Sequence, residues 1–110
     1  MANTFSNQKQ NNVGTSDTTI YTVGNTSGYR TIVVGCSLAN TTNSSVTADV
    51  SVFSSGGTQY YLVKNAPVPS GGSLEVMAGN KLVLNQNETL KVKSSASSSL
   101  DVLLSIMEIT

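Results

Sequence analysis

The sequence contains no histidine, no tryptophan and a single cysteine. Without histidine, the usual general acid–base pairs and most metal-ligand sets are missing. Glycoside hydrolysis would need a carboxylate pair, and the six carboxylates form no recognisable paired motif. We therefore expect a protein that is not an enzyme, with no catalytic residues, no metal site and no cofactor.

Cys36 is that single cysteine, so no intrachain disulfide can form. It lies inside the apolar run 32–38 and has no histidine to activate it as a nucleophile. Free cysteines of this kind behave as small hydrophobic residues. We expect Cys36 to be buried in the core.

Charge is also scarce. Charged residues make up 11% of the chain, against about 25% in an average soluble domain, and six basic residues balance six acidic ones. The basic residues are spread along the chain, whereas nucleic-acid binders carry a clustered basic surface. We expect no nucleic-acid partner, and the weak self-repulsion of a neutral chain favours association.

Long apolar runs are absent as well. No stretch approaches the roughly 18 apolar residues of a membrane span, and residues 1–19 lack the apolar core of a signal peptide. We expect no membrane partner, and a protein that is made in a cytoplasm-like compartment and stays there until assembly.

Short β-type segments fill the rest of the chain. Val46, Ala48, Val50 and Val52 alternate with polar residues, which is typical of a half-buried antiparallel strand. Pro67 and Pro69 indicate a loop over 66–72. The expected strands cover 18–23, 29–39, 46–53, 58–64, 73–77, 81–84, 89–93 and 100–109. A sandwich or a small barrel fits this spacing, and we predict an all-β fold: a single antiparallel β-sandwich of about seven to eight short strands, immunoglobulin-like or jelly-roll-like.

Residues 1–17 differ in composition from the rest. They are rich in Asn, Gln, Ser and Thr, with Phe5 and Val13 as isolated apolar residues. Such a segment cannot form its own core. We predict an extended or flexible N-terminal arm over 1–17, outside a sandwich domain over 18–110, with Phe5 and Val13 contacting a neighbouring subunit.

Two aromatic pairs are further interface candidates. Tyr60 and Tyr61 are adjacent on one expected strand, so only one ring can face the core. Tyr29 and Arg30 combine residue types that are enriched at interface hot spots. The candidate interface residues are therefore Phe5, Val13, Tyr29, Arg30, Tyr60 and Tyr61.

The last strand is apolar on both faces, because Leu103, Met107 and Ile109 are out of phase with its even-numbered apolar positions. Such a strand is either central in the sandwich or covered by another subunit. The sequence leaves both alternatives open.

Residues 29–110 resemble a group of short virion structural proteins of tailed bacteriophages. The resemblance is carried by the segments 66–75, 81–84, 87–92, 100–102 and 105–110. It implies a structural component of a virion, and we expect a capsid cement or decoration protein that bridges neighbouring subunits of the shell. Its partners would be the major capsid protein and copies of itself, as a trimer or dimer. The alternatives are a neck, tail or fibre-attachment adaptor, and a carbohydrate-binding β-sandwich module.

Overall fold

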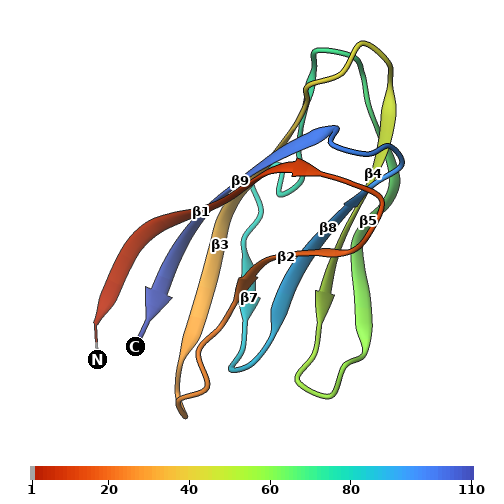
Figure 1. Ribbon diagram of the computed structural model, residues 1–110. Helices are drawn as coiled ribbons and strands as arrows, with labels where there is room; N and C mark the ends of the chain where they lie inside the picture. Colours follow the sequence, from red (N-terminus) through yellow and green to blue (C-terminus); the bar gives the residue numbers. More distant parts are fainter. Residues whose placement is uncertain (1) are drawn as a thin grey trace.

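The computed structural model describes residues 2–110, which form two antiparallel sheets packed face to face (Figure 1). Within these residues there is no helix, and hence none that could span a membrane. The strands are β1 (Asn3–Val13), β2 (Thr18–Thr22), β3 (Arg30–Asn40), β4 (Val46–Phe53), β5 (Gln59–Val68), β6 (Ser73–Glu75), β7 (Leu82–Leu84), β8 (Thr89–Ser94) and β9 (Leu100–Ile109). The predicted all-β antiparallel sandwich is confirmed.

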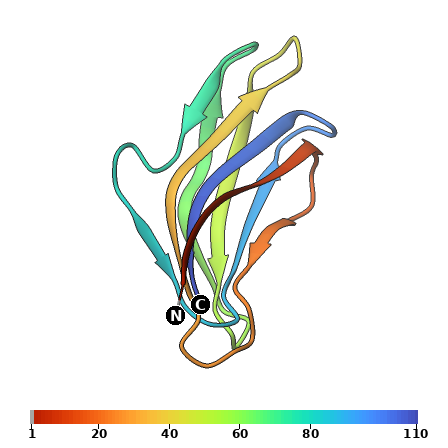
Figure 2. The same cartoon turned by 90° about the vertical axis from the view of Figure 1, so that its left-hand side faces the viewer.

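The first sheet has the order β1-β9-β3-β6, and β7 also pairs with β3. The second sheet has the order β2-β8-β4-β5. In Figure 2 strands β3, β9 and β1 of the first sheet lie in front of β4 and β5 of the second, and the two ends of the chain lie next to each other. The backbones of Ala2 and Thr110 exchange hydrogen bonds of 3.2 and 2.9 Å there.

Strand β9 is the centre of the first sheet. Leu100, Val102, Leu104 and Ile106 point into the core and are at most 2% exposed. Burial of each such side chain contributes about 1.5–3 kcal/mol, so this strand supplies a large share of the stabilisation. The opposing layer contributes residues such as Leu90 of β8, which is also fully buried.

Polar contacts join the two sheets at one end. The hydroxyl of Tyr21, on β2, lies 2.9 Å from the Thr31 hydroxyl of β3 and donates to Oε2 of Glu108 on β9 at 2.8 Å. Burial raises the pKa of Tyr21, and the neighbouring Glu108 carboxylate adds to that effect. The phenol is therefore held in its neutral form and can donate to the carboxylate.

The prediction of an arm outside the sandwich is wrong for residues 3–13. They form β1, an edge strand that pairs with β9 from Asn3 to Gln10 and again at Val13. Val13 is 1% exposed, so it belongs to this chain's own core and does not contact a neighbouring subunit. The composition gave no apolar pattern for this strand because its residues on the core side of the sheet, such as Ser6 and Gln10, are polar and remain exposed.

The predicted loop over 66–72 begins three residues later than expected. Strand β5 continues to Val68, with Pro67 opposite Thr47 of β4. β5 is the edge of the second sheet, where a proline without an N–H group is tolerated. The proline thus marks an edge strand and not the end of one.

The two apolar residues of β1 give a matched test of this arrangement. Val13→Ala should destabilise the protein by about 2 kcal/mol, because it removes two buried methyl groups and leaves a cavity. Phe5→Ala should change stability by less than about 0.5 kcal/mol, because the Phe5 side chain is 75% exposed. Urea unfolding of both variants measures this, and an unchanged stability for Val13→Ala would mean that β1 is no part of the fold.

Candidate functional site

An apolar row crosses the outer face of the first sheet, the face turned away from the core. Phe5 of β1 is opposite Met107 of β9, Met107 is opposite Ile32 of β3, and Ile32 is opposite Val83 of β7. Directly opposite residues share one face of a sheet, so the four side chains lie next to one another. We call these four residues the outer-face row.

The outer-face row is open to solvent at both ends. Phe5 is 75% exposed and Val83 is 55% exposed, whereas Met107 and Ile32 between them are half-buried. With neighbouring strands about 4.8 Å apart, the row is roughly 14 Å long. Strands β1, β9 and β3, which carry most of it, lie side by side in Figure 1.

Strand β9 explains why this face is apolar. Its even-numbered residues fill the core, so its odd-numbered residues Leu103 and Met107 point outward. Leu103 is 48% exposed. The question left open by the sequence is therefore answered in part: β9 is central in its sheet, and its second apolar face is uncovered in the described chain.

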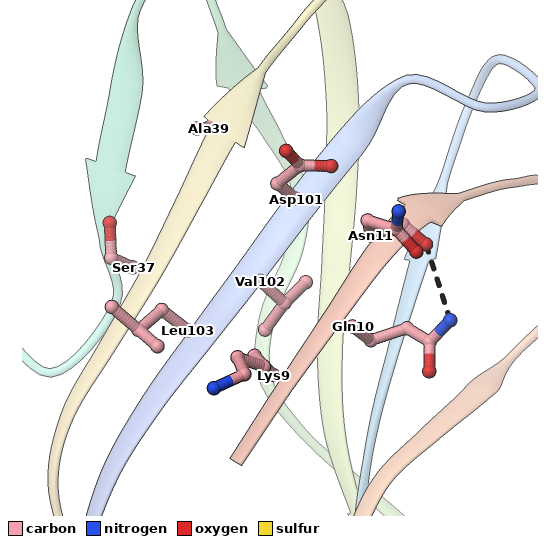
Figure 3. Close-up of a pocket in the computed structure, with 8 residues that line it drawn as sticks. All are labelled: Lys9, Gln10, Asn11, Ser37, Ala39, Asp101, Val102 and Leu103. Atoms are coloured by element: carbon pink, nitrogen blue, oxygen red, sulfur yellow. Dashed lines mark hydrogen bonds between the residues drawn. The ribbon is translucent and has the colours of Figure 1, made fainter. Parts of the chain in front are cut away.

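A shallow depression of about 570 Å³ adjoins Leu103 on the same face (Figure 3). Two opposite charges border it, Lys9 of β1 and Asp101 of β9, and Oδ1 of Asp101 accepts a hydrogen bond of 3.1 Å from the backbone N–H of Asn12. Its lining residues are Lys9, Gln10, Asn11, Ser37, Ala39, Asp101, Val102 and Leu103. The outer face thus combines an apolar row with a small polar depression.

The predicted interface residues are not brought together. Phe5 lies on the outer-face row, whereas Tyr29 is half-buried and packs against the core. Arg30 begins β3 with an exposed side chain, and its guanidinium donates to the backbone carbonyl of Tyr29 at 2.8 Å. Val13, as described above, is buried.

Tyr60 and Tyr61 lie on β5, in the other sheet. Their side chains are 62% and 46% exposed, so neither fills the core. The ammonium of Lys64 lies 4.6 Å from the centre of the Tyr61 ring, which gives that ring a partner within the chain. These residues therefore form a separate surface from the outer-face row.

Sequence reasoning identified Met107 as part of a second apolar face of the last strand, but it missed Ile32, Val83 and Asp101 as members of this face. The out-of-phase apolar residues of the last strand were the available signal. The pairing of Ile32 with both Met107 and Val83 depends on strand order and register, which the spacing of residues does not reveal.

Few titratable groups gather anywhere in the structure. Within residues 2–110 no group of three or more His, Cys, Asp or Glu residues lies close enough to hold a metal ion. Cys36 is fully buried, as predicted, and its backbone N–H donates to Oε2 of Glu75 at 2.9 Å. Burial, together with the Glu75 carboxylate, raises the pKa of the Cys36 thiol to about 12.

Comparisons with known proteins bear on the fold. No protein-family model matches the chain, and no curated protein matches it. One similar solved structure is described as "Bacillus endospore appendages form a novel family of disulfide-linked pili". Its TM-score is 0.60 at 13% identity, covering 99% of this chain and 87% of that one. At this identity the likeness shows a shared β-sandwich fold.

The thiol of Cys36 gives a prediction about alkaline stability. The pKa of this thiol is raised from its ordinary value of 9.0 to about 12 in the folded protein. The contribution of the neutral thiol to the free energy of unfolding is therefore fully present below pH 9 and is lost as the pH rises toward 12. Between pH 8 and pH 10 the free energy of unfolding should fall by roughly 1 kcal/mol more in the wild type than in Cys36→Ala.

Urea unfolding at the two pH values measures this difference. Tyrosines and lysines titrate in both proteins, so their contribution drops out of the comparison with the variant. An equal fall in the free energy of unfolding in both proteins would contradict the raised pKa of the thiol. A thiol reagent should also leave the folded wild type unmodified.

Proposed function

We propose that this chain is a non-enzymatic structural protein of a bacteriophage virion, and that it acts as a capsid cement or decoration protein. The proposal combines the resemblance of residues 29–110 to short phage virion proteins with the uncovered outer-face row. Its partner would be the major capsid protein, and its place the assembled particle.

The outer-face row is the observation that carries the proposal. Contiguous apolar surface on a soluble protein marks an interaction site more often than scattered apolar residues do. Phe5 and Val83 expose more than half of their side chains at its two ends, with Met107 and Ile32 joining them. A shell protein that covered this row would remove all four side chains from water.

Binding by this face would be passive. The sandwich is held by two continuous hydrogen-bonded sheets and would bridge neighbouring shell subunits without changing shape. Lys9 and Asp101, of opposite charge, lie beside Leu103 and would orient the bound molecule. Many copies on one particle would reinforce the shell, even if each binds weakly.

The same face would serve a neck, tail or fibre-attachment adaptor, and the similar pilus structure raises a subunit of a filament as a further candidate. That structure is described as disulfide-linked, whereas the one cysteine of this chain is buried. A carbohydrate-binding module is less well supported, because Tyr60 and Tyr61 are adjacent along one strand and cannot form a single stacking platform.

Binding to the shell gives the test. Purified protein should co-sediment with capsids of the phage that encodes it, after accessory proteins have been removed, and should saturate at a fixed ratio to the capsid protein. The double variant Phe5→Ser/Val83→Ser should weaken this binding by about tenfold or more, because each exposed side chain contributes on the order of 1 kcal/mol when buried.

The matched control is Tyr60→Ser/Tyr61→Ser, which changes two exposed apolar residues on the other sheet. It should bind like the wild type. Absence of binding by the wild type would contradict the proposal, as would a loss in the tyrosine variant alone. Binding confined to one vertex or to the tail would favour the adaptor.

A further inference from the structure

The open edge of β1 is the longest regular edge that the structure leaves unpaired. β1 stands at the end of its sheet and pairs with β9 from Asn3 to Gln10 without a register shift. The opposite edge of that sheet is made of β6 and β7, with three residues each.

The edges of the second sheet are less suited to pairing. β2 has five residues and a register shift. β5 has two register shifts, contains Pro67, and has Asn65 at a φ of 54°. Such interruptions are the usual means by which proteins block pairing of sheet edges. β1 lacks them over residues 3–10.

The hydrogen-bond pattern shows which groups of β1 are free. Ala2 and Thr110 exchange two backbone hydrogen bonds, so they form a hydrogen-bonded pair of the β1–β9 ladder. In an antiparallel ladder such pairs alternate with pairs that do not exchange hydrogen bonds. The even-numbered residues of β1 therefore bond to β9. The odd-numbered residues, Asn3, Phe5, Asn7 and Lys9, direct their N–H and C=O groups toward the open edge.

We propose that this edge pairs with the β1 edge of a second copy of the chain, antiparallel, about a twofold axis through Asn7. Asn7 then lies opposite its own counterpart, and Phe5 lies opposite Lys9 of the second copy. In this register odd-numbered residues of one strand lie opposite odd-numbered residues of the other, so the free N–H and C=O groups of both strands face each other. The inference goes beyond the proposed function, because it requires no shell.

The side chains favour this register. Lys9 is the only charged residue of β1, and the pairing sets it against an exposed phenylalanine rather than against a second lysine. The chain already uses such contacts within its own fold. The ammonium of Lys91 lies 4.3 Å from the centre of the Phe53 ring, and that of Lys64 lies 4.6 Å from the Tyr61 ring. A second copy is thus complementary in backbone hydrogen bonds, and the register pairs each lysine with an aromatic ring.

Pairing would also join the outer faces of the two molecules. The first sheets would continue into one sheet, with β3, β9 and β1 of one copy followed by β1, β9 and β3 of the other. The outer-face rows of both copies would then lie on the same side of this larger sheet. The dimer would offer two apolar rows to one partner surface.

Sedimentation over a range of concentrations tests the pairing. The wild type should shift toward twice the monomer mass as its concentration rises. Asn7→Pro should stay monomeric, because proline removes an N–H group of the open edge while the β1–β9 bonds, made by even-numbered residues, remain. Asn7→Ser is the control, since it keeps the N–H group, and it should dimerise like the wild type.

A cysteine in place of Asn7 tests the register. Directly opposite residues in a hydrogen-bonded pair lie about 5.5 Å apart at Cα, within the range that a disulfide spans. Under mild oxidation Asn7→Cys should form at least about tenfold more cross-linked dimer than Asn85→Cys, an exposed control, because pairing raises the local thiol concentration. The buried thiol of Cys36 should not take part.

Three outcomes would overturn the inference: a wild type that is monomeric at every concentration, an Asn7→Pro variant that dimerises normally, or equal cross-linking of the two cysteine variants. The shell-binding test is separate. A wild type that is monomeric at every concentration but still binds capsids would overturn this inference alone. A dimer that does not bind capsids would overturn the proposed function alone.

Discussion

The burial of one face of β9 is the constraint on which the rest of the structure depends. Leu100, Val102, Leu104 and Ile106 fill the middle of the core, and β9 uses its two edges to hold β1 and β3. A shift of one residue would turn this buried set toward solvent, so the register of the whole first sheet is fixed by these four side chains. The same register aligns Phe5, Met107, Ile32 and Val83 on the outer face.

Most strands and the fold class could be predicted because their patterns are local. The alternation from Val46 to Val52 and the run around Cys36 each indicate a strand without knowledge of its partner. β1 could not be predicted in this way, since its pairing relies on backbone groups and on one buried side chain, Val13. A polar sequence can form an edge strand when the neighbouring strand supplies the hydrogen bonds.

The candidate site was predictable only in part for a related reason. Phe5 was identified from its isolation in a polar segment, and the second apolar face of β9 from its out-of-phase residues. Which residues stand beside them follows from the order of strands, and this order brings together residues as distant in sequence as Phe5 and Met107. The outer face and the open edge of β1 meet at Phe5, so one strand presents both surfaces that we assign to assembly.

Residue-resolved amide hydrogen exchange of β1, in dilute protein, tests the central claim most directly. The claim is that residues 3–10 form an edge strand that is bonded to β9 on one side and free on the other. It predicts an alternating pattern, with slow exchange at Thr4, Ser6 and Gln8 and fast exchange at Phe5, Asn7 and Lys9. Uniformly fast exchange over these residues would contradict the account, because it would show an unpaired arm in place of a strand.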